Sequence, residues 1–402
     1  MGSQEFSWKR ACILAGACIA LVIGSGFATG QELVQYFTAY GLGGLAVVAI
    51  FAIVFIYYNI NFARVGAREQ YEVGNQVFQH FCGKKLGTFF DYYSTMFCYM
   101  SFFVMIGGAA STLQQGFGLP SWVGGALVCA IVVAIVCLGL SKLVDIIGII
   151  GPIKIAFFVV IGLVVLCMDW QQLPAGLEAV NTGALTGATA NEGMVKAGDN
   201  WLISGLSYAG FVLLWFASFM TLLGAKNDRK SLSAGIVIAT VVICLAIVII
   251  YCAQLANINT GADGVYVWNA PIPNLILADK VWPPLSVVYS VVVFIGICAT
   301  AVPLLYNPAA RFAKEGTRKF RLLALGLGVA GLVIGLFVPY RTLVNVVYVI
   351  NGYIGAVLLV FMVARNLRDF VAKRRAAKGT APARPAAGRA LDSDFEDPAI
   401  EG

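Results

Sequence analysis

Hydrophobic residues along the chain fall in long runs that are separated by short polar connections. About ten of these runs reach the roughly twenty residues that an α-helix needs to cross about 30 Å of hydrocarbon. The pattern predicts spans at 12–39, 42–63, 86–116, 121–141, 144–169, 200–224, 232–257, 284–311, 321–339 and 342–365. We therefore predict an all-α, polytopic membrane protein. Lys9 and Arg10 precede the first run, which we interpret as a helix rather than a secretory signal because no convincing cleavage site follows.

The order of the spans indicates a duplication. Five spans precede the connection at 170–199 and five follow it, so the two halves must enter the membrane from opposite sides, as in an inverted repeat. The predicted organisation is an N-terminal segment 1–11, a first five-helix repeat 12–169, an extracellular loop 170–199, a second repeat 200–365 and a disordered cytoplasmic tail 366–402.

Charged residues in the connections indicate the orientation. One side holds only Lys196, Lys280 and Arg341. The basic residues of the other side are Lys9, Arg10, Arg64, Arg68, Lys84, Lys85, Lys142, Lys226, Arg229, Lys230, Lys314, Arg318, Lys319 and Arg321. The positive-inside rule then predicts that both termini are cytoplasmic, which requires an even number of spans. We predict a multi-pass protein of the inner cell membrane.

Composition supports the membrane class and limits the chemistry. Hydrophobic residues make up 60% of the chain and charged residues 12%, about half of what a soluble domain carries. The ten cysteines lie in or beside apolar runs without a C-x-x-C pair, which is typical of small buried hydrophobes. His80 is the only histidine. We predict no metal site, no cofactor and no nucleic-acid partner.

The first span contains a polar and flexible segment, "IGSGFATGQELVQYF", at residues 23–37. Gly24, Gly26 and Gly30 allow the chain to leave helical geometry, and Glu32 is an acid at membrane depth, which marks a candidate functional residue. Broken backbone is tolerated there only where protein or a water-lined cavity satisfies its polar groups. We predict that this span is interrupted beside a cavity; a close helix contact through the glycines is the alternative.

The sixth span, "WLISGLSYAGFVLLWFASFMTLLG", is the counterpart of the first in an inverted repeat, and we predict that it is interrupted as well. Its first half gathers Ser204, Gly205, Ser207, Tyr208, Ala209 and Gly210. The connection at 258–283 contains "NAPIPNLILADKVWPP". Its prolines and short apolar run fit either a re-entrant or capping loop over an outward opening or an ordinary surface loop.

These features together resemble the LeuT-type fold of the amino acid–polyamine–organocation superfamily. The segment "GSGFATGQE" is similar to the first helix of the YkvI-like branch, which bears G-x-G-F-A-[ST]-G-Q-E. The resemblance covers roughly residues 10–365 and implies secondary active transport by alternating access. The substrate would bind between spans 1, 3, 6, 8 and 10. The candidate substrate-binding residues are Gly24, Ser25, Gly26, Phe27, Ala28, Thr29, Gly30, Gln31, Glu32, Tyr99, Ser207, Tyr208, Ala209 and Gly210.

Three residues are candidates for ion coupling. Glu32 could carry a proton, pair with a substrate amine or only stabilise its own helix end. In sodium-coupled members of the superfamily, a cation lies between carbonyls of span 1 and hydroxyls of span 8, whereas some proton-coupled members resemble this chain in placing a span 5 lysine there. Lys154 would be that lysine, unless it only extends toward the inner face. Thr300 is flanked by alanines, so the hydroxyl pair of a sodium site is incomplete.

Other polar and aromatic positions have a structural interpretation beside the functional one. Tyr92, Tyr99 and Phe103 of span 3 could line a cavity or only pack between helices. Asn345, Tyr348 and Asn351 of span 10 could line the cavity or hydrogen-bond across the helix bundle. The charged residues Arg64, Arg68, Glu69, Glu72 and Asp91 could close an inner gate or simply follow the membrane topology.

We therefore expect a secondary transporter of a small zwitterionic or amine solute, most plausibly an amino acid. Sodium-independent, proton-coupled transport is favoured over sodium symport. A ligand-sensing membrane subunit that does not transport is the alternative from another class. An enzyme is disfavoured because no set of nucleophile, base and orienting residue can be assembled from the few ionisable residues within the spans.

Overall fold

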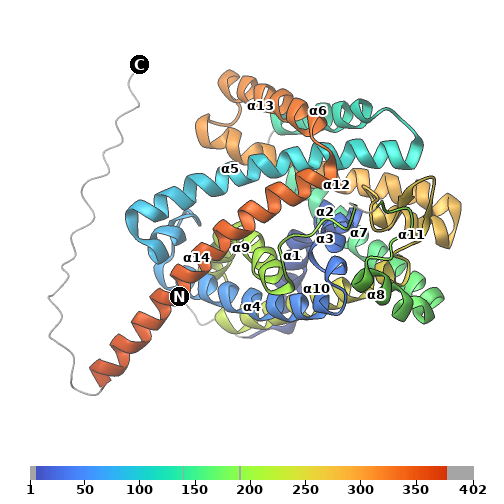
Figure 1. Ribbon diagram of the computed structural model, residues 1–402. Helices are drawn as coiled ribbons and strands as arrows, with labels where there is room; N and C mark the ends of the chain where they lie inside the picture. Colours follow the sequence, from blue (N-terminus) through green and yellow to red (C-terminus); the bar gives the residue numbers. More distant parts are fainter. Residues whose placement is uncertain (1–5, 139, 190–191, 378–402) are drawn as a thin grey trace.

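The computed structural model describes residues 6–138, 140–189 and 192–377, without the side chains of Ser25, 140–154 and 375–377. In this part the chain is almost entirely helical (Figure 1). The first half contains α1 (Trp8–Val22), α2 (Ser25–Thr29), α3 (Gln31–Tyr36), the 3₁₀ helix η1 (Thr38–Tyr40), α4 (Gly43–Glu69), α5 (Gln76–Phe117), α6 (Ser121–Leu138) and α7 (Leu140–Asp169). The segment between the halves holds η2 (Trp170–Gln172) and α8 (Leu173–Thr182).

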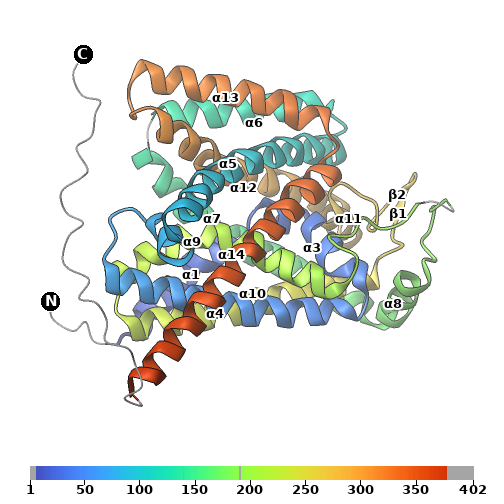
Figure 2. The ribbon, with the colours of Figure 1, turned by 60° about the vertical axis from the view of Figure 1, so that its left-hand side comes forward.

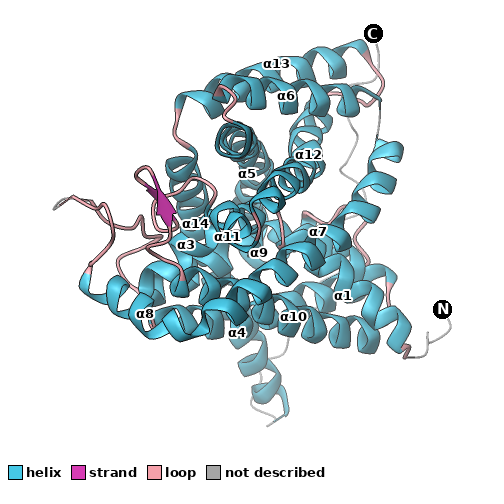
Figure 3. Ribbon diagram, turned by 90° about the vertical axis from the view of Figure 1, so that its right-hand side faces the viewer, coloured by secondary structure: helices cyan, strands magenta, loops and turns pink. Residues whose placement is uncertain are grey.

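The second half begins with α9 (Trp201–Lys226) and α10 (Arg229–Ala256). Next comes a hairpin of two short antiparallel strands, β1 (Gly261–Ala262) and β2 (Val265–Tyr266). The short helix α11 (Pro273–Val281) follows it (Figure 3). The chain then forms α12 (Pro283–Phe312), α13 (Arg318–Phe337) and α14 (Tyr340–Ala377). Polar side chains fix several starts, since Asn200, Asp228 and Thr317 accept bonds from the first-turn N–H groups of α9, α10 and α13.

Nine helices in the described part of the chain are long and apolar enough to cross a membrane. The predicted first span is not among them because it is broken: α1 has 15 residues, α2 five and α3 six. The all-α, polytopic prediction is confirmed, and the ten predicted spans correspond to these nine helices and one interrupted helix. In α5 the backbone leaves helical geometry at Gly83 (φ +74°), ahead of the predicted span 86–116.

The helices form two groups that are joined by α7 and α14. In one group α1 packs on α10 and α4 on α9; in the other, α5 packs on α6, α12 and α13. Figures 1 and 2 show α14 crossing obliquely between the groups. The contacts follow the inverted repeat, because exchanging each helix for its counterpart turns the α1–α10 contact into α9–α4 and the α5–α14 contact into α12–α7.

The prediction that the sixth span is interrupted is wrong, because α9 is one continuous helix over Trp201–Lys226. Its small residues serve close packing on α14 instead. A Cβ on Gly210 would overlap the carbonyl oxygen of Gly352, and one on Gly355 would overlap that of Gly210. Ser207 faces Gly352 in the same contact. This is the small-residue helix contact that the sequence offered as the alternative for the first span.

The predicted start of the disordered tail, at residue 366, needs correction. The apolar pattern stops at Arg365, but α14 continues to Ala377. The added residues are good helix formers, and Arg365 lies 3.9 Å from Asp369 one turn later. The rest of the predicted tail, 378–402, lies outside the described residues.

The two ends of the helix bundle differ in character. One end, the basic face, carries the α9–α10 and α12–α13 connections, with Lys226, Arg229, Lys230, Lys314 and Arg318. The opposite end, the loop face, carries α8, the hairpin and α11, which Figure 2 shows together on one side.

Candidate functional site

The first span is broken at two points that flank a single helical turn. Ile23 and Gly24 leave helical geometry after α1, α2 follows, and Gly30 adopts φ +83° before α3. Only glycine suits the second point, because a Cβ on Gly30 would overlap the side-chain amides of Asn274 and Gln254 in addition to straining the backbone. The predicted interruption is therefore present, and it is more structured than a continuous unwound segment.

Side chains from other helices hold the carbonyl groups of the break on the loop-face side. The Tyr289 hydroxyl donates to the Ala28 carbonyl at 2.5 Å. The Asn274 amide donates to the carbonyls of Phe27 and Ala28, both at 3.3 Å. Gln254 donates to the Gly30 carbonyl at 3.0 Å and to Asn274 at 2.9 Å. Because Asn274 belongs to α11, the connection at 258–283 is a capping segment rather than an ordinary loop.

Two further contacts close this side of the break. The Thr29 hydroxyl lies 2.9 Å from the Tyr340 hydroxyl at the start of α14. The Asn345 amide donates to Gln35 of α3 at 3.1 Å, and Gln35 donates to the Arg341 carbonyl at 2.9 Å. The second half of the first span is thus fastened to α14 and to the cap.

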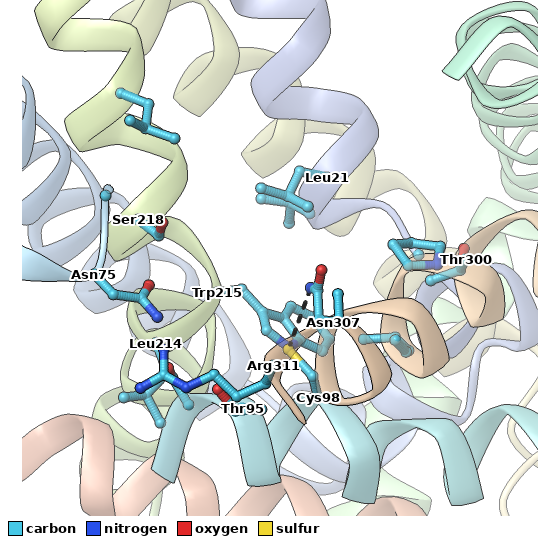
Figure 4. Close-up of a pocket in the computed structure, with 18 of the residues that line it drawn as sticks. Leu21, Asn75, Thr95, Cys98, Leu214, Trp215, Ser218, Thr300, Asn307 and Arg311 are labelled. Carbon is cyan, nitrogen blue, oxygen red and sulfur yellow. Dashed lines mark hydrogen bonds between the residues drawn. The ribbon is translucent and has the colours of Figure 1, made fainter. Parts of the chain in front are cut away.

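A cavity of about 520 Å³ reaches the break from the basic face. Figure 4 shows side chains of α1, α5, α9 and α12 around it. Gly24, Gly26, Glu32, Thr300 and Tyr348 line its deep end, and Glu72, Asn75 and Arg311 line its mouth. The remaining lining residues are Leu21, Val22, Val73, Gly74, Ser94, Thr95, Cys98, Met105, Leu214, Trp215, Ser218, Leu222, Pro303, Leu304, Asn307 and Ala310.

Glu32 is the acid at the deep end of this cavity and is only 4% exposed. Its side chain folds back over Gly26, where a Cβ would overlap the carboxylate oxygen Oε2. No cation among the described side chains forms an ion pair with it, and the described side chains do not include Lys154. A buried carboxyl without a counter-ion is costly, which favours a proton or a ligand cation as its partner.

Several buried polar atoms near Glu32 also lack partners within the described residues. The Tyr208 hydroxyl lies beside the Glu32 carboxyl without a hydrogen bond of good geometry. The Gln31 amide and the Trp215 indole N–H are likewise buried and unpaired. Trp215 is held rigidly, stacked on Phe97 at 5.3 Å between ring centroids. Unpaired buried groups of this kind are expected where a ligand or water binds.

An ion pair stands at the mouth of the cavity. Arg311 of α12 donates to both carboxylate oxygens of Asp91 on α5, at 2.7 and 3.3 Å, and its guanidinium lies 4.6 Å from the Tyr92 ring centre. The Asn75 amide also donates to Asp91, at 2.7 Å. Asp91 therefore does form an ion pair here, but among the described residues Arg68 pairs only with its neighbour Glu69. Arg311 is not predicted from the sequence, because it looks like an ordinary basic residue that ends an apolar span.

Twelve of the fourteen predicted substrate-binding residues divide into three groups. Gly24, Gly26 and Glu32 line the cavity, as does the coupling candidate Thr300, whose hydroxyl donates to the Gly296 carbonyl. Phe27 to Gly30 are buried under the cap. The buried residues beside the cavity rather than on its wall are Gln31, Ser207, Tyr208, Ala209 and Gly210.

Three candidates remain. Tyr99 lies away from the cavity, because its hydroxyl donates to the Leu327 carbonyl of α13 at 2.9 Å and its ring packs on Phe103. It therefore serves helix packing, the interpretation that competed with ligand contact. The side chains of Ser25 and Lys154 lie outside the described residues. The part of α9 that lines the cavity begins at Leu214, one to two turns beyond the predicted positions.

Comparison with known proteins supports a transporter fold. The family model described as "Sodium:alanine symporter family" matches residues 76–211. The uncharacterized protein YyaD of Bacillus subtilis (strain 168) is 31% identical over 135 residues, which are 34% of this chain and 39% of that protein. The match therefore spans well under half of this relative.

Three solved structures share the fold at 14% identity each. An inward-facing structure of Mhp1 aligns with a TM-score of 0.58 over 92% of this chain and 77% of that one. MhsT in complex with L-phenylalanine aligns with 0.53 over 89% of both chains. The manganese transporter of Eremococcus coleocola, bound to an aromatic bis-isothiourea compound, aligns with 0.52 over 94% of this chain and 90% of that one. The chain thus has the LeuT-type fold.

Proposed function

We propose that this protein is a secondary transporter that moves a small amine-bearing solute of the amino acid class by alternating access. The observation that carries the proposal is the cavity that opens to the basic face and ends on Glu32 at the break, while α11, α12 and α14 close the other side. A solute bound there could enter or leave from one side of the membrane only, which is what alternating access requires.

The chemistry of the deep end supports an amine. Glu32 offers a negative charge without a counter-ion among the described side chains, and Gly26 leaves room for the carboxylate to face the cavity. Trp215 and Tyr348 supply an apolar wall with ring centroids 5.9 Å apart. The alanine in the matching family description and the phenylalanine bound to MhsT support a zwitterionic amino acid as the class.

We infer an inward-open state from charge. If the basic face is cytoplasmic, as the positive-inside rule predicts, both termini lie inside the cell and the cavity opens to the cytoplasm. A reporter fused after Ala377 tests this: a cytoplasmic reporter would be active there, and a periplasmic one would not.

Two observations point to different coupling ions. The family match over residues 76–211 supports sodium. Glu32 as the unpaired acid, together with the single hydroxyl of Thr300 flanked by Ala299 and Ala301, supports a proton. Uptake of L-alanine and L-phenylalanine into proteoliposomes, driven separately by a sodium gradient and by a pH gradient, distinguishes the two.

The same assay tests the alternative of a ligand-sensing subunit. A thermal-shift screen of amino acids and amines first identifies a ligand of the purified protein. Saturable binding combined with neither uptake nor exchange of that ligand would contradict transport and favour sensing.

A further inference from the structure

A second cavity of about 460 Å³ lies on the basic face, apart from the candidate site. It is formed by the ends of α4 and α14 and by the first turns of α5. Its lining residues are Tyr57, Ile60, Asn61, Arg64, Val65, Arg68, His80, Asn366, Asp369, Phe370 and Lys373. Figures 1 and 2 show the last turns of α14 extending beyond the other helices near this place.

The floor of the cavity is polar and ordered. The Asn366 amide donates to the Tyr57 hydroxyl at 2.8 Å and to the Asn61 side-chain oxygen at 3.0 Å. These bonds join α4 to α14, so the polar side chains of Tyr57, Asn61 and Asn366 on the floor already bond one another. A ligand in the cavity would therefore be held mainly by the residues above the floor.

The upper wall carries an excess of positive charge. Arg64, Arg68 and Lys373 face one carboxylate, Asp369. Arg68 is paired with Glu69 and Asp369 lies 3.9 Å from Arg365. Arg64 and Lys373 have no hydrogen bond or ion pair among the described residues. Basic residues are expected on this face from topology alone, but here they border a cavity large enough for a headgroup.

An exposed apolar stripe runs along α14 beside the cavity. Val363, Leu367 and Phe370 of α14 are 47%, 60% and 51% exposed and are spaced so that they share one side of the helix. Phe370 also lines the cavity. The cavity thus joins cationic groups to an exposed apolar surface. An anionic phospholipid has the complementary parts, a negatively charged headgroup and apolar acyl chains.

We propose that this cavity binds the phosphate group of an anionic phospholipid, with Arg64 and Lys373 as its charge partners and an acyl chain along the exposed side of α14. A phosphate group accepts charge-assisted hydrogen bonds from guanidinium and ammonium groups. The ligand would tie the end of α4, a helix of one group, to the end of α14, which joins the two groups of the fold. This proposal does not depend on the proposed transport function.

The test uses the full chain in detergent and compares phosphatidylglycerol, phosphatidylcholine and inorganic phosphate as added probes in a thermal-shift titration. We expect saturable stabilisation by phosphatidylglycerol that weakens as salt is raised. The double variant Arg64→Gln/Lys373→Gln should lose at least tenfold in apparent affinity. The matched control is Lys84→Gln/Lys85→Gln, which removes two exposed cations from the same face outside the cavity and should keep wild-type affinity.

Three results would overturn the proposal. Equal losses in the two double variants would mean that only the general charge of the face matters. Equal stabilisation by phosphatidylcholine would remove the need for an anionic headgroup. Inorganic phosphate acting at the same concentration as the lipid would identify a soluble phosphate compound as the ligand instead.

Discussion

The carboxylate of Glu32 lies directly over the α-carbon of Gly26, so the acid of α3 fills the space that a side chain on α2 would take. This relationship brings the acid to the end of the cavity. The two residues, six positions apart in the sequence, therefore form one structural unit, because the first must be small for the side chain of the second to take this position.

Replacing Gly26 with alanine should move the carboxylate without unfolding the protein. The added Cβ meets the far end of a flexible side chain, which can shift. We expect ligand affinity to fall at least tenfold, about 1.4 kcal/mol, with little change in the unfolding temperature. Gly16→Ala is the control in α1, because its Cβ would meet nothing within 4 Å and should leave affinity unchanged. Wild-type affinity in Gly26→Ala would contradict this role of the carboxylate.

Gly30→Ala should destabilise the fold. Its φ of +83° costs a side chain about 1–2 kcal/mol, and the Cβ would also displace Asn274 and Gln254 from the bonds that hold the break. Gly183→Ala has a similar φ of +75° and open space around it, so it measures the backbone strain alone. We expect a lower inactivation temperature for Gly30→Ala than for Gly183→Ala. Equal temperatures would show that the cap does not depend on close approach at Gly30.

Removing the Asn274 side chain should loosen the closure of the loop face. Asn274→Ala deletes the side-chain bonds by which α11 holds the Phe27 and Ala28 carbonyls, although these carbonyls keep their bonds from the Gly30 N–H and the Tyr289 hydroxyl. We expect faster amide hydrogen exchange in residues 25–36, measured by mass spectrometry. Asn259→Ala is the control, since Asn259 bonds only exposed groups of the neighbouring loop. Identical exchange in both variants would mean that α11 does not hold the break closed.

The ion pair between Asp91 and Arg311 should contribute to stability through its geometry. It is bidentate and its side chains are only 17% and 28% exposed, so we expect a coupling energy of about 1–2 kcal/mol. A double-mutant cycle with Asp91→Asn and Arg311→Gln, read by thermal inactivation, measures it. A coupling energy near zero would mean that the mouth of the cavity does not rely on this pair.

The sequence predicted the membrane class, the spans and the interruption of the first span, because these depend on local hydropathy and on glycines beside an acid. The prediction failed at the sixth span, where small residues such as Ser207 and Gly210 pack against another helix and do not interrupt their own. Whether such residues break a helix or let two helices approach depends on the partner, here Gly352 and Gly355 of α14, which a single span does not reveal.

The candidate site was predictable only where one segment supplies it. Gly24, Gly26 and Glu32 stand close together in the sequence and reach the cavity together. Arg311 and Asn75 could not be assigned to it, because they come from segments far from the first span in the sequence and look like ordinary residues beside a predicted span. Tyr99 lies near the middle of its predicted span, but its side chain points away from the cavity, since its hydroxyl donates to the Leu327 carbonyl. Side-chain direction depends on how the helices are rotated against each other.

Glu32 at the end of the cavity is the residue that we propose binds or couples a transported solute. The most direct test of this role is uptake of the ligand found by thermal shift into proteoliposomes, with wild type, Glu32→Gln and Glu32→Asp compared at equal reconstitution. We predict saturable uptake by the wild type, loss of at least a hundredfold in Glu32→Gln and partial retention in Glu32→Asp, with all three proteins folded. Undiminished uptake by Glu32→Gln would contradict the proposed role.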